Sequence, residues 1–146
     1  MVFKSTSPSL TQKIAARLAR KIIKTKLKNA LIIGLTGELG AGKTNFIQGF
    51  AKELKIRERL TSPTFVISRN YNIKTKHYKK LFHVDAYRLK NIKETKILNF
   101  EPVIENPKNI ILIEWAERIK KILPKETIWI NFEHGKKENE RIIKIR

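Results

Sequence analysis

Cysteine is absent from this chain of 146 residues, which excludes disulfide bonds, thiolate nucleophiles and cysteine zinc sites. Histidine is scarce as well, and His77, His83 and His134 lie too far apart in the sequence to predict a metal cluster. No apolar run reaches the roughly 20 residues that a membrane-spanning helix needs. The first twelve residues lack the apolar segment of a secretory signal. These absences predict a globular cytoplasmic protein with no membrane partner.

Acidic residues are few: 13 Asp and Glu stand against 32 Lys and Arg, which gives a net charge of +19. Such an excess is typical of a surface that attracts nucleic acid or an acidic partner. A compositional bias towards lysine, with side chains that only solvate the surface, explains the excess equally well. The lysines are spread along the whole chain, so the sequence leaves both interpretations open.

Two continuous apolar runs, 30–35 and 110–115, predict strands that are buried on both faces, as in parallel sheets. Four further segments predict strands that pair in antiparallel hairpins: 64–72 with 77–85, and 127–133 with 141–146 around a turn at Gly135.

Helical patterns occupy the stretches between these strands. Ser7, Pro8 and Ser9 predict a helix start, with Ser9 and Gln12 as a capping box, and an amphipathic helix with a basic outer face follows. Three other segments predict helices: 44–54, 91–100 and 116–123. Helices that alternate with buried strands and hairpins predict a single α/β domain over residues 1–146, with a mixed, partly parallel sheet.

The glycine-rich stretch GELGAGKT, residues 37–44, follows the first buried strand and opens a helix. Gly37, Gly42, Lys43 and Thr44 match G-x-x-x-x-G-K-[ST], a phosphate-binding loop. Its backbone N–H groups must point inward at phosphate oxygens, which requires positive φ and space that side chains at Gly40 or Gly42 would fill. Lys43 supplies a point charge for the outer phosphates, and the hydroxyl of Thr44 supplies a ligand for Mg²⁺.

A nucleotide site of this kind needs an acid near the metal, and two carboxylates end apolar strands. Glu114 ends one buried run and Asp85 ends the second strand of the first hairpin. One of them can hold Mg²⁺ while the other orients or deprotonates the attacking water; spacing alone does not assign the two roles. The segment 61–65, TSPTF, is in isolation best explained as a polar turn. The alternative is that the hydroxyl of Thr64 or Ser62 senses the γ-phosphate.

Four motifs in this order, GELGAGKT, SPTF, HVDAYRL and IEW, resemble the bacterial TsaE proteins, and the resemblance runs from about Thr11 to Arg141. TsaE proteins are small P-loop ATPases needed to make threonylcarbamoyladenosine in tRNA. The resemblance implies a P-loop NTPase-like three-layer domain that binds ATP and Mg²⁺. The segment 99–109 carries little of the family pattern, and Val84 stands where the family often has phenylalanine.

The resemblance also implies roles for individual residues. The phosphate ligands would be Gly37, Gly40, Ala41, Gly42, Lys43 and Thr44. Thr44 and Glu114 would hold Mg²⁺, and Asp85 would be the acid that hydrolysis requires. Thr64 would belong to a switch-like catalytic loop, which reverses the preference for a plain turn. Arg141 would lie near the nucleotide, and Trp115 would be either functional or part of the core. His83 and Arg88 are motif members to which no role follows.

For partners, the resemblance implies TsaD, which transfers the threonylcarbamoyl group to tRNA, together with TsaB. Hydrolysis, weak in the chain alone, would reset that complex between turnovers, and the chain would meet tRNA through the complex. Two alternatives remain open. A small-molecule kinase would need a nucleotide lid and an acceptor pocket, for which the chain has little room. A nucleotide-gated RNA-binding module would bind RNA without partners.

Overall fold

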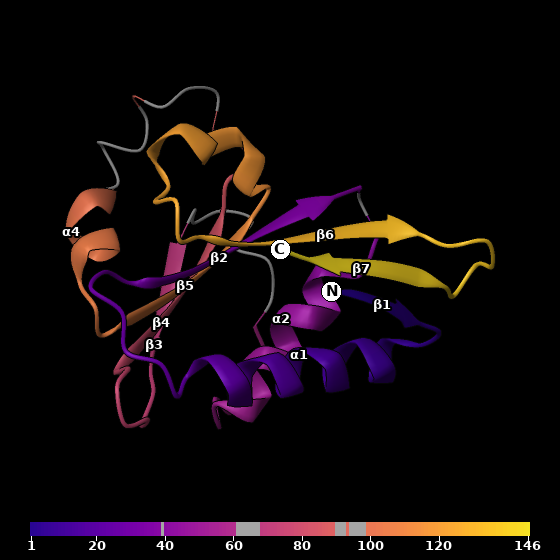
Figure 1. Ribbon diagram of the computed structural model, residues 1–146, viewed down its shortest axis with the longest axis horizontal. Helices are drawn as coiled ribbons and strands as arrows, with labels where there is room; N and C mark the ends of the chain where they lie inside the picture. The colour runs from indigo at the N-terminus through magenta and orange to yellow at the C-terminus, as the bar shows by residue number, and fades with distance from the viewer. Residues whose placement is uncertain (39, 61–67, 90–92, 94–98) are drawn as a thin grey trace.

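The computed structural model describes residues 1–38, 40–60, 68–89, 93 and 99–146. A seven-stranded sheet with the order β1-β7-β6-β2-β5-β4-β3 forms its middle layer (Figure 1). The strands are β1 (Val2–Ser5), β2 (Leu31–Gly37), β3 (Ser68–Asn72), β4 (Lys80–Asp85), β5 (Asn109–Glu114), β6 (Ile128–His134) and β7 (Arg141–Ile145). The helices are α1 (Pro8–Ile22), α2 (Lys43–Glu53), α4 (Phe100–Glu105) and the 3₁₀ helix η1 (Ala116–Ile122).

The sheet is parallel in its centre and antiparallel at both edges. Strand β2 pairs in parallel with β5 on one side and with β6 on the other, and β4 extends the parallel part beyond β5. Strand β3 pairs antiparallel with β4, and β7 pairs antiparallel with both β6 and β1. Both predicted hairpins and the mixed α/β sheet are therefore confirmed, except that positions 64–67 of the first hairpin lie outside the described residues.

Alternate residues of the central strands enter two separate cores. On β2, Leu31, Ile33 and Leu35 pack in the core that contains the buried sides of α1 and α2. Ile32 of β2 and Ile113 of β5 belong to the second core, which contains buried residues of α4 and η1. Figure 1 shows α1 and α2 on one side of the sheet and α4 and η1 on the other. This is the expected three-layer arrangement.

The first helix begins at Pro8, and its cap is Ser7, whose side-chain oxygen accepts a hydrogen bond of 3.1 Å from the Leu10 N–H. Proline suits the first helical position because its φ is already helical and its missing N–H would have no partner there. The predicted helix start is thus confirmed, but the capping box of Ser9 and Gln12 is wrong, because Ser9 already lies inside the helix.

Several elements differ from the sequence-based expectation. Strand β1 was not predicted, because four residues carry almost no pattern and the strand forms through its pairing with β7. Helix α4 was not predicted either, whereas most of the predicted helix 91–100 lies outside the described residues. The segment expected as a helix over 116–123 is a 3₁₀ helix that is kinked at Ile119. In the described part of the chain, none of the helices has the length and apolar character needed to span a bilayer.

The contact between α1 and α2 predicts the effect of a small substitution. A Cβ added at Gly49 of α2 would lie 2.5 Å from both the Cα and the carbonyl oxygen of Gln12 in α1. Although alanine favours a helix over glycine by about 1 kcal/mol, Gly49→Ala should lower the free energy of unfolding by about 1–3 kcal/mol, because backbone must move to make room. Urea denaturation measures this change.

The matched control is Lys52→Ala on the exposed side of the same helix, which should alter stability by less than about 0.5 kcal/mol. A Gly49→Ala protein as stable as the parent would mean that the two helices do not constrain each other at this crossing.

Candidate functional site

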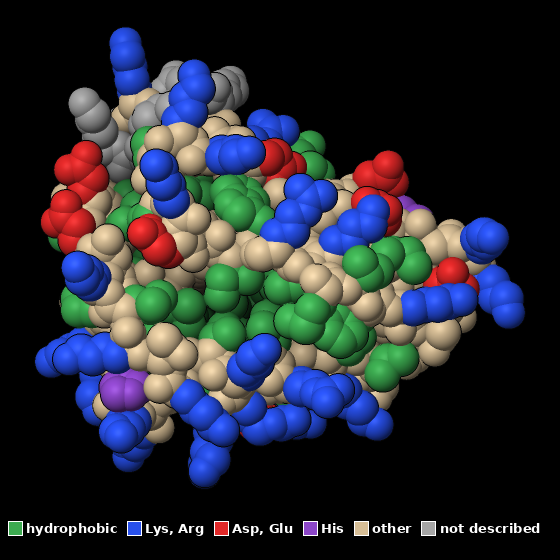
Figure 2. All heavy atoms as spheres, in the orientation of Figure 1, with side chains coloured by type: hydrophobic (Ala, Val, Ile, Leu, Met, Phe, Trp, Pro, Cys, Tyr) green, Lys and Arg blue, Asp and Glu red, His purple; other side chains and the backbone are tan. Residues whose placement is uncertain are grey.

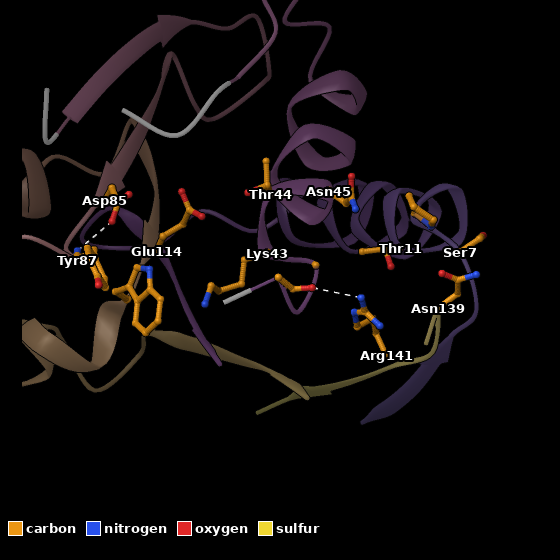
Figure 3. Close-up of a pocket in the computed structure, with 14 residues that line it drawn as sticks. Ser7, Thr11, Lys43, Thr44, Asn45, Asp85, Tyr87, Glu114, Asn139 and Arg141 are labelled. Carbon is orange, nitrogen blue, oxygen red and sulfur yellow. Dashed lines mark hydrogen bonds between the residues drawn. The ribbon is translucent and has the colours of Figure 1, made fainter. Parts of the chain in front are cut away.

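A cavity of about 370 Å³ opens where β4 and β5 end and α2 begins. Its lining includes seven of the residues that the sequence predicts for the site: Gly40, Gly42, Lys43, Thr44, Asp85, Glu114 and Arg141 (Figure 3). Gly37 and Ala41 lie in the same loop, next to the lining residues. The prediction for Thr64 falls outside the described residues. The fold therefore brings together side chains that are up to about a hundred positions apart in the sequence.

The loop between β2 and α2 has the backbone that its glycines were expected to provide. Gly37, Gly40 and Gly42 have φ values of 127°, 75° and 102°, a region that side chains other than glycine rarely adopt. A Cβ on Gly37 would also lie 2.2 Å from the carbonyl oxygen of Phe132. Gly42 caps α2 without a side-chain hydrogen bond, so the N–H groups of the first helical turn remain available for an anion.

Lys43 is buried, with 6% of its surface exposed, and its ammonium group lies inside the loop. The ammonium donates hydrogen bonds to the carbonyl oxygens of Gly37 and Glu38, the second over 3.3 Å. It also lies 4.0 Å from the ring centroid of Trp115. Burial lowers the pKa of Lys43 below its ordinary value, and the nearby carboxylates, Glu114 first, oppose that shift. An anionic ligand would likewise favour the charged form of this lysine.

The two predicted carboxylates meet because their strands are neighbours. Asp85 and Glu114 are the last residues of β4 and β5 and face each other in the parallel register. In Figure 3 they lie on the same side of the cavity as Thr44, with Arg141 on the opposite side. The Asp85 carboxylate accepts a hydrogen bond of 2.9 Å from the Tyr87 N–H. This local turn fixes the direction of the Asp85 side chain as the chain leaves the strand.

His83 gains a role that the sequence did not supply. Its Nε2 lies 2.8 Å from Oε2 of Glu114, and both side chains are buried, with 1% and 6% of their surfaces exposed. An ionised carboxylate only accepts hydrogen bonds, so Nε2 carries the proton. Among the described residues, Nδ1 of His83 has no partner. The imidazole thus fixes one oxygen of Glu114 and leaves the other for a ligand in the cavity.

The oxygen donors of the cavity suit a magnesium ion that arrives with its substrate. The described residues contain no group of three or more His, Asp or Glu side chains that could hold a metal alone. Mg²⁺ keeps several waters and is usually held through one or two carboxylates together with substrate phosphates. The hydroxyl of Thr44 and the carboxylates of Glu114 and Asp85 fit that mode of binding.

Two further motif residues line the cavity: Trp115 of IEW and Tyr87 of HVDAYRL. Trp115 has a positive φ of 56°, and its ring centroid lies 5.0 Å from that of Tyr87. Five other residues of the lining lie outside the motifs and were missed: Ser7, Pro8, Thr11, Asn45 and Asn139. They come from the start of α1, from α2 and from the β6–β7 turn, and only the folded chain brings them to the loop.

Arg141, for which the resemblance implied a place near the nucleotide, lies against the glycine loop. Its guanidinium group donates a hydrogen bond of 3.3 Å to the carbonyl oxygen of Gly40 (Figure 3). It also donates to the carbonyl oxygens of Glu138 and Glu140, at 2.6 Å and 2.9 Å. The Arg141 side chain therefore connects the start of β7 with the glycine loop that borders the cavity.

Several known proteins resemble this chain over most of its length. The family model "Threonylcarbamoyl adenosine biosynthesis protein TsaE" matches residues 5–143. A protein of Bacillus subtilis named tRNA threonylcarbamoyladenosine biosynthesis protein TsaE is 34% identical over 128 residues, which cover 88% of this chain and 74% of the relative. The protein of the same name in Rickettsia felis is 38% identical over 136 residues, which cover 92% of this chain and 73% of the relative.

Among solved structures, the crystal structure of YdiB from Bacillus subtilis superposes with a TM-score of 0.75 at 30% sequence identity, covering 98% of this chain and 82% of that one. The family match spans nearly the whole chain, including every element that builds the cavity. The chain belongs to the TsaE family of threonylcarbamoyl adenosine biosynthesis proteins.

Proposed function

We propose that this chain binds ATP with Mg²⁺ in the cavity and hydrolyses it to ADP and phosphate, as the ATPase subunit that supports threonylcarbamoyladenosine modification of tRNA. One observation carries the proposal: the glycine loop, its lysine and threonine, and two strand-end carboxylates line the same cavity. These are the parts that P-loop enzymes use for phosphoryl transfer. The tRNA modification comes from the names of the relatives.

The proposed phosphate site is made mostly of main chain. The loop from Gly37 to Gly42 and the first turn of α2 would surround the phosphates with N–H donors, helped by the positive end of the helix dipole. Lys43 would bind the outer phosphates through its buried ammonium group. Arg141 lies beside Gly40, where its positive charge adds to the attraction of the loop for an anion.

The proposed metal site is made of Thr44 and Glu114, with His83 holding the carboxylate in place. When bound, Mg²⁺ would neutralise charge on the phosphate oxygens. Asp85 would accept a proton from the attacking water, because its carboxylate ends the strand next to that of Glu114 and points from a fixed turn. Thr64 is proposed as a further catalytic residue from the family motif alone.

The partners proposed for this ATPase are the proteins TsaD and TsaB, with tRNA reached through their complex. Hydrolysis would be slow in the isolated chain and faster with the partners, and it would reset the complex between rounds of modification. The support for this part is membership of the family.

Phosphate release from ATP, measured with the chain alone and with TsaD and TsaB, tests the proposal. Lys43→Ala should lower the rate tenfold or more, since a hydrogen bond to a charged group contributes about 1.5–3 kcal/mol. Lys52→Ala, which removes an exposed lysine from the other end of the same helix, should leave the rate unchanged. The proposal fails if the parent protein releases no phosphate under any of these conditions.

The two carboxylates should separate binding from chemistry. Asp85→Asn should bind ATP within a few-fold of the parent and lose hydrolysis by about 10²–10⁴-fold, the range for a general base. Glu114→Gln should weaken ATP binding only when Mg²⁺ is present.

The histidine that holds Glu114 should affect the same step. His83→Leu should weaken Mg²⁺-dependent ATP binding less than Glu114→Gln does. His83→Gln keeps a hydrogen-bond donor and should therefore bind ATP more tightly than His83→Leu. Calorimetric titrations with and without Mg²⁺ measure these affinities; equal losses in both conditions would contradict the metal assignment.

Trp115 provides a spectroscopic signal for the occupied site. Because the Lys43 ammonium lies 4.0 Å from the indole ring, phosphates that bind this ammonium should alter the tryptophan fluorescence. The change should persist in Trp129→Phe and disappear in Trp115→Phe. A signal that follows Trp129, which belongs to the second core and packs near Lys120, would mean that the nucleotide binds elsewhere.

A further inference from the structure

The positive charge of the chain is unevenly divided. Residues 1–80 contain 18 Lys and Arg and 3 acidic residues, a net charge of +15, whereas residues 81–146 contain 14 and 10, a net charge of +4. Lys and Arg are about equally frequent in the two parts, so the difference arises because the first part has almost no acidic residues to offset them. The first part builds α1, α2, β3 and the turn that leads into β4, so the excess gathers on particular elements of the fold.

Two hollows of about 390 and 670 Å³ lie at the end of α2 that points away from the glycine loop. We call their basic residues the basic face: Lys24, Lys52, Lys55, Arg57, Arg59, Lys74 and Lys76. Lys55 lines both hollows, so they form one continuous surface. In Figure 2, Lys and Arg side chains crowd the lower edge of the molecule, over α1 and the β3–β4 turn of Figure 1.

The charge of this basic face is almost uncompensated. All seven side chains are exposed, and within the described part of the chain none of them forms an ion pair. The hollows contain two carboxylates, and one of these, Glu53, pairs with Arg20 over 2.9 Å. Unpaired cations this close together repel one another, and a polyanion on the face would remove that repulsion.

Lys55 adds an independent observation. It follows the end of α2 with a φ of 61°, and its N–H donates to the carbonyl oxygen of Lys52 over 3.0 Å. Glycine is the usual residue at this position because it adopts positive φ without strain. Here a lysine occupies this strained position in the middle of the basic face, which indicates that a positively charged side chain is favoured there.

The chemistry of the face favours nucleic acid over an acidic protein. Protein interfaces have a core of aromatic and apolar side chains. The apolar residues that line the two hollows, such as Ile23, Leu54 and Ile56, are buried or half-buried, and none of the large exposed hydrophobic residues of the described chain lines either hollow. Phosphate backbones, in contrast, are held by exposed lysine and arginine. A helix of the length of α2, about 16 Å, separates this face from the nucleotide cavity.

We propose that the basic face binds the phosphate backbone of tRNA directly, while the nucleotide cavity remains accessible at the other end of α2. The choice of tRNA as the polyanion rests on the proposed function, and the direct contact would add to the encounter through the complex with TsaD and TsaB proposed there. Binding through phosphates would be insensitive to base sequence and strongly dependent on salt. One chain could then bind tRNA and ATP at the same time.

The test measures binding of the full chain to an unmodified tRNA transcript by fluorescence anisotropy across a salt series. The triple variant Lys55→Gln, Arg57→Gln and Lys74→Gln should weaken binding tenfold or more, and the slope of log K against log salt should fall by about three, one for each lost phosphate contact. The control variant Lys108→Gln, Lys121→Gln and Lys125→Gln loses the same charge from exposed positions of the second part and should bind within threefold of the parent.

A second variant separates charge from folding. Lys55→Gly removes one cation and relieves the strained backbone, so it should lower tRNA affinity without lowering the thermal stability of the protein. Equal losses in both triple variants, or no binding of tRNA by the parent at low salt, would overturn the proposal. The proposal would also be wrong if the triple variant of the basic face kept its tRNA affinity but no longer associated with TsaD and TsaB, because the face would then be a protein-binding surface.

The result can be read apart from the ATPase proposal. ATP binding of the face triple, measured without RNA, should equal that of the parent, since its three substitutions lie away from the cavity. If the parent protein binds tRNA but not ATP, the ATPase proposal is wrong and the proposal for the basic face stands. A parent that hydrolyses ATP but does not bind tRNA would do the reverse.

Discussion

The parallel pairing of β2 with β5, and of β5 with β4, is the constraint on which the site depends. Parallel strands place all their carboxyl ends at one edge of a sheet, and ligands bind in the crevice outside that edge. The register then aligns Asp85 with Glu114 and Glu114 with Leu35, two residues before the glycine loop. A shift of one residue in either pairing would turn a carboxylate to the opposite face of the sheet, so the apolar residues that fix the register also fix the chemistry.

The most local signals of the sequence gave the most reliable predictions. The loop motif, the two buried apolar strands and the hairpins each depend on neighbouring residues, and the structure contains all of them. The positions of Asp85 and Glu114 followed from the same logic, because an acid that ends a buried strand must lie at the sheet edge. Short elements that depend on distant pairing, such as β1 against β7, left no local pattern to recognise.

Side-chain partnerships were beyond the reach of spacing. Nothing in the order of residues relates His83 to Glu114, which are 31 positions apart, yet adjacent strands bring them within 2.8 Å. Likewise, the start of α1 and Asn139 reach the cavity only through the packing of α1 on the sheet and the β6–β7 turn. The charge excess was visible in the composition, but its gathering around Lys55 became meaningful only when α2 and the β3–β4 turn were placed together.

Lys43 already has partners: two carbonyl oxygens of its own loop and the indole face of Trp115. A phosphate that reaches this ammonium therefore replaces existing interactions, and the free energy gained is the difference between the two sets. The gain is smaller than an ammonium group without partners would give, and the same partners would receive the lysine again when the anion departs. If the proposed function holds, these returning contacts would favour release of the anion, and long retention of a nucleotide would depend on contacts outside the loop.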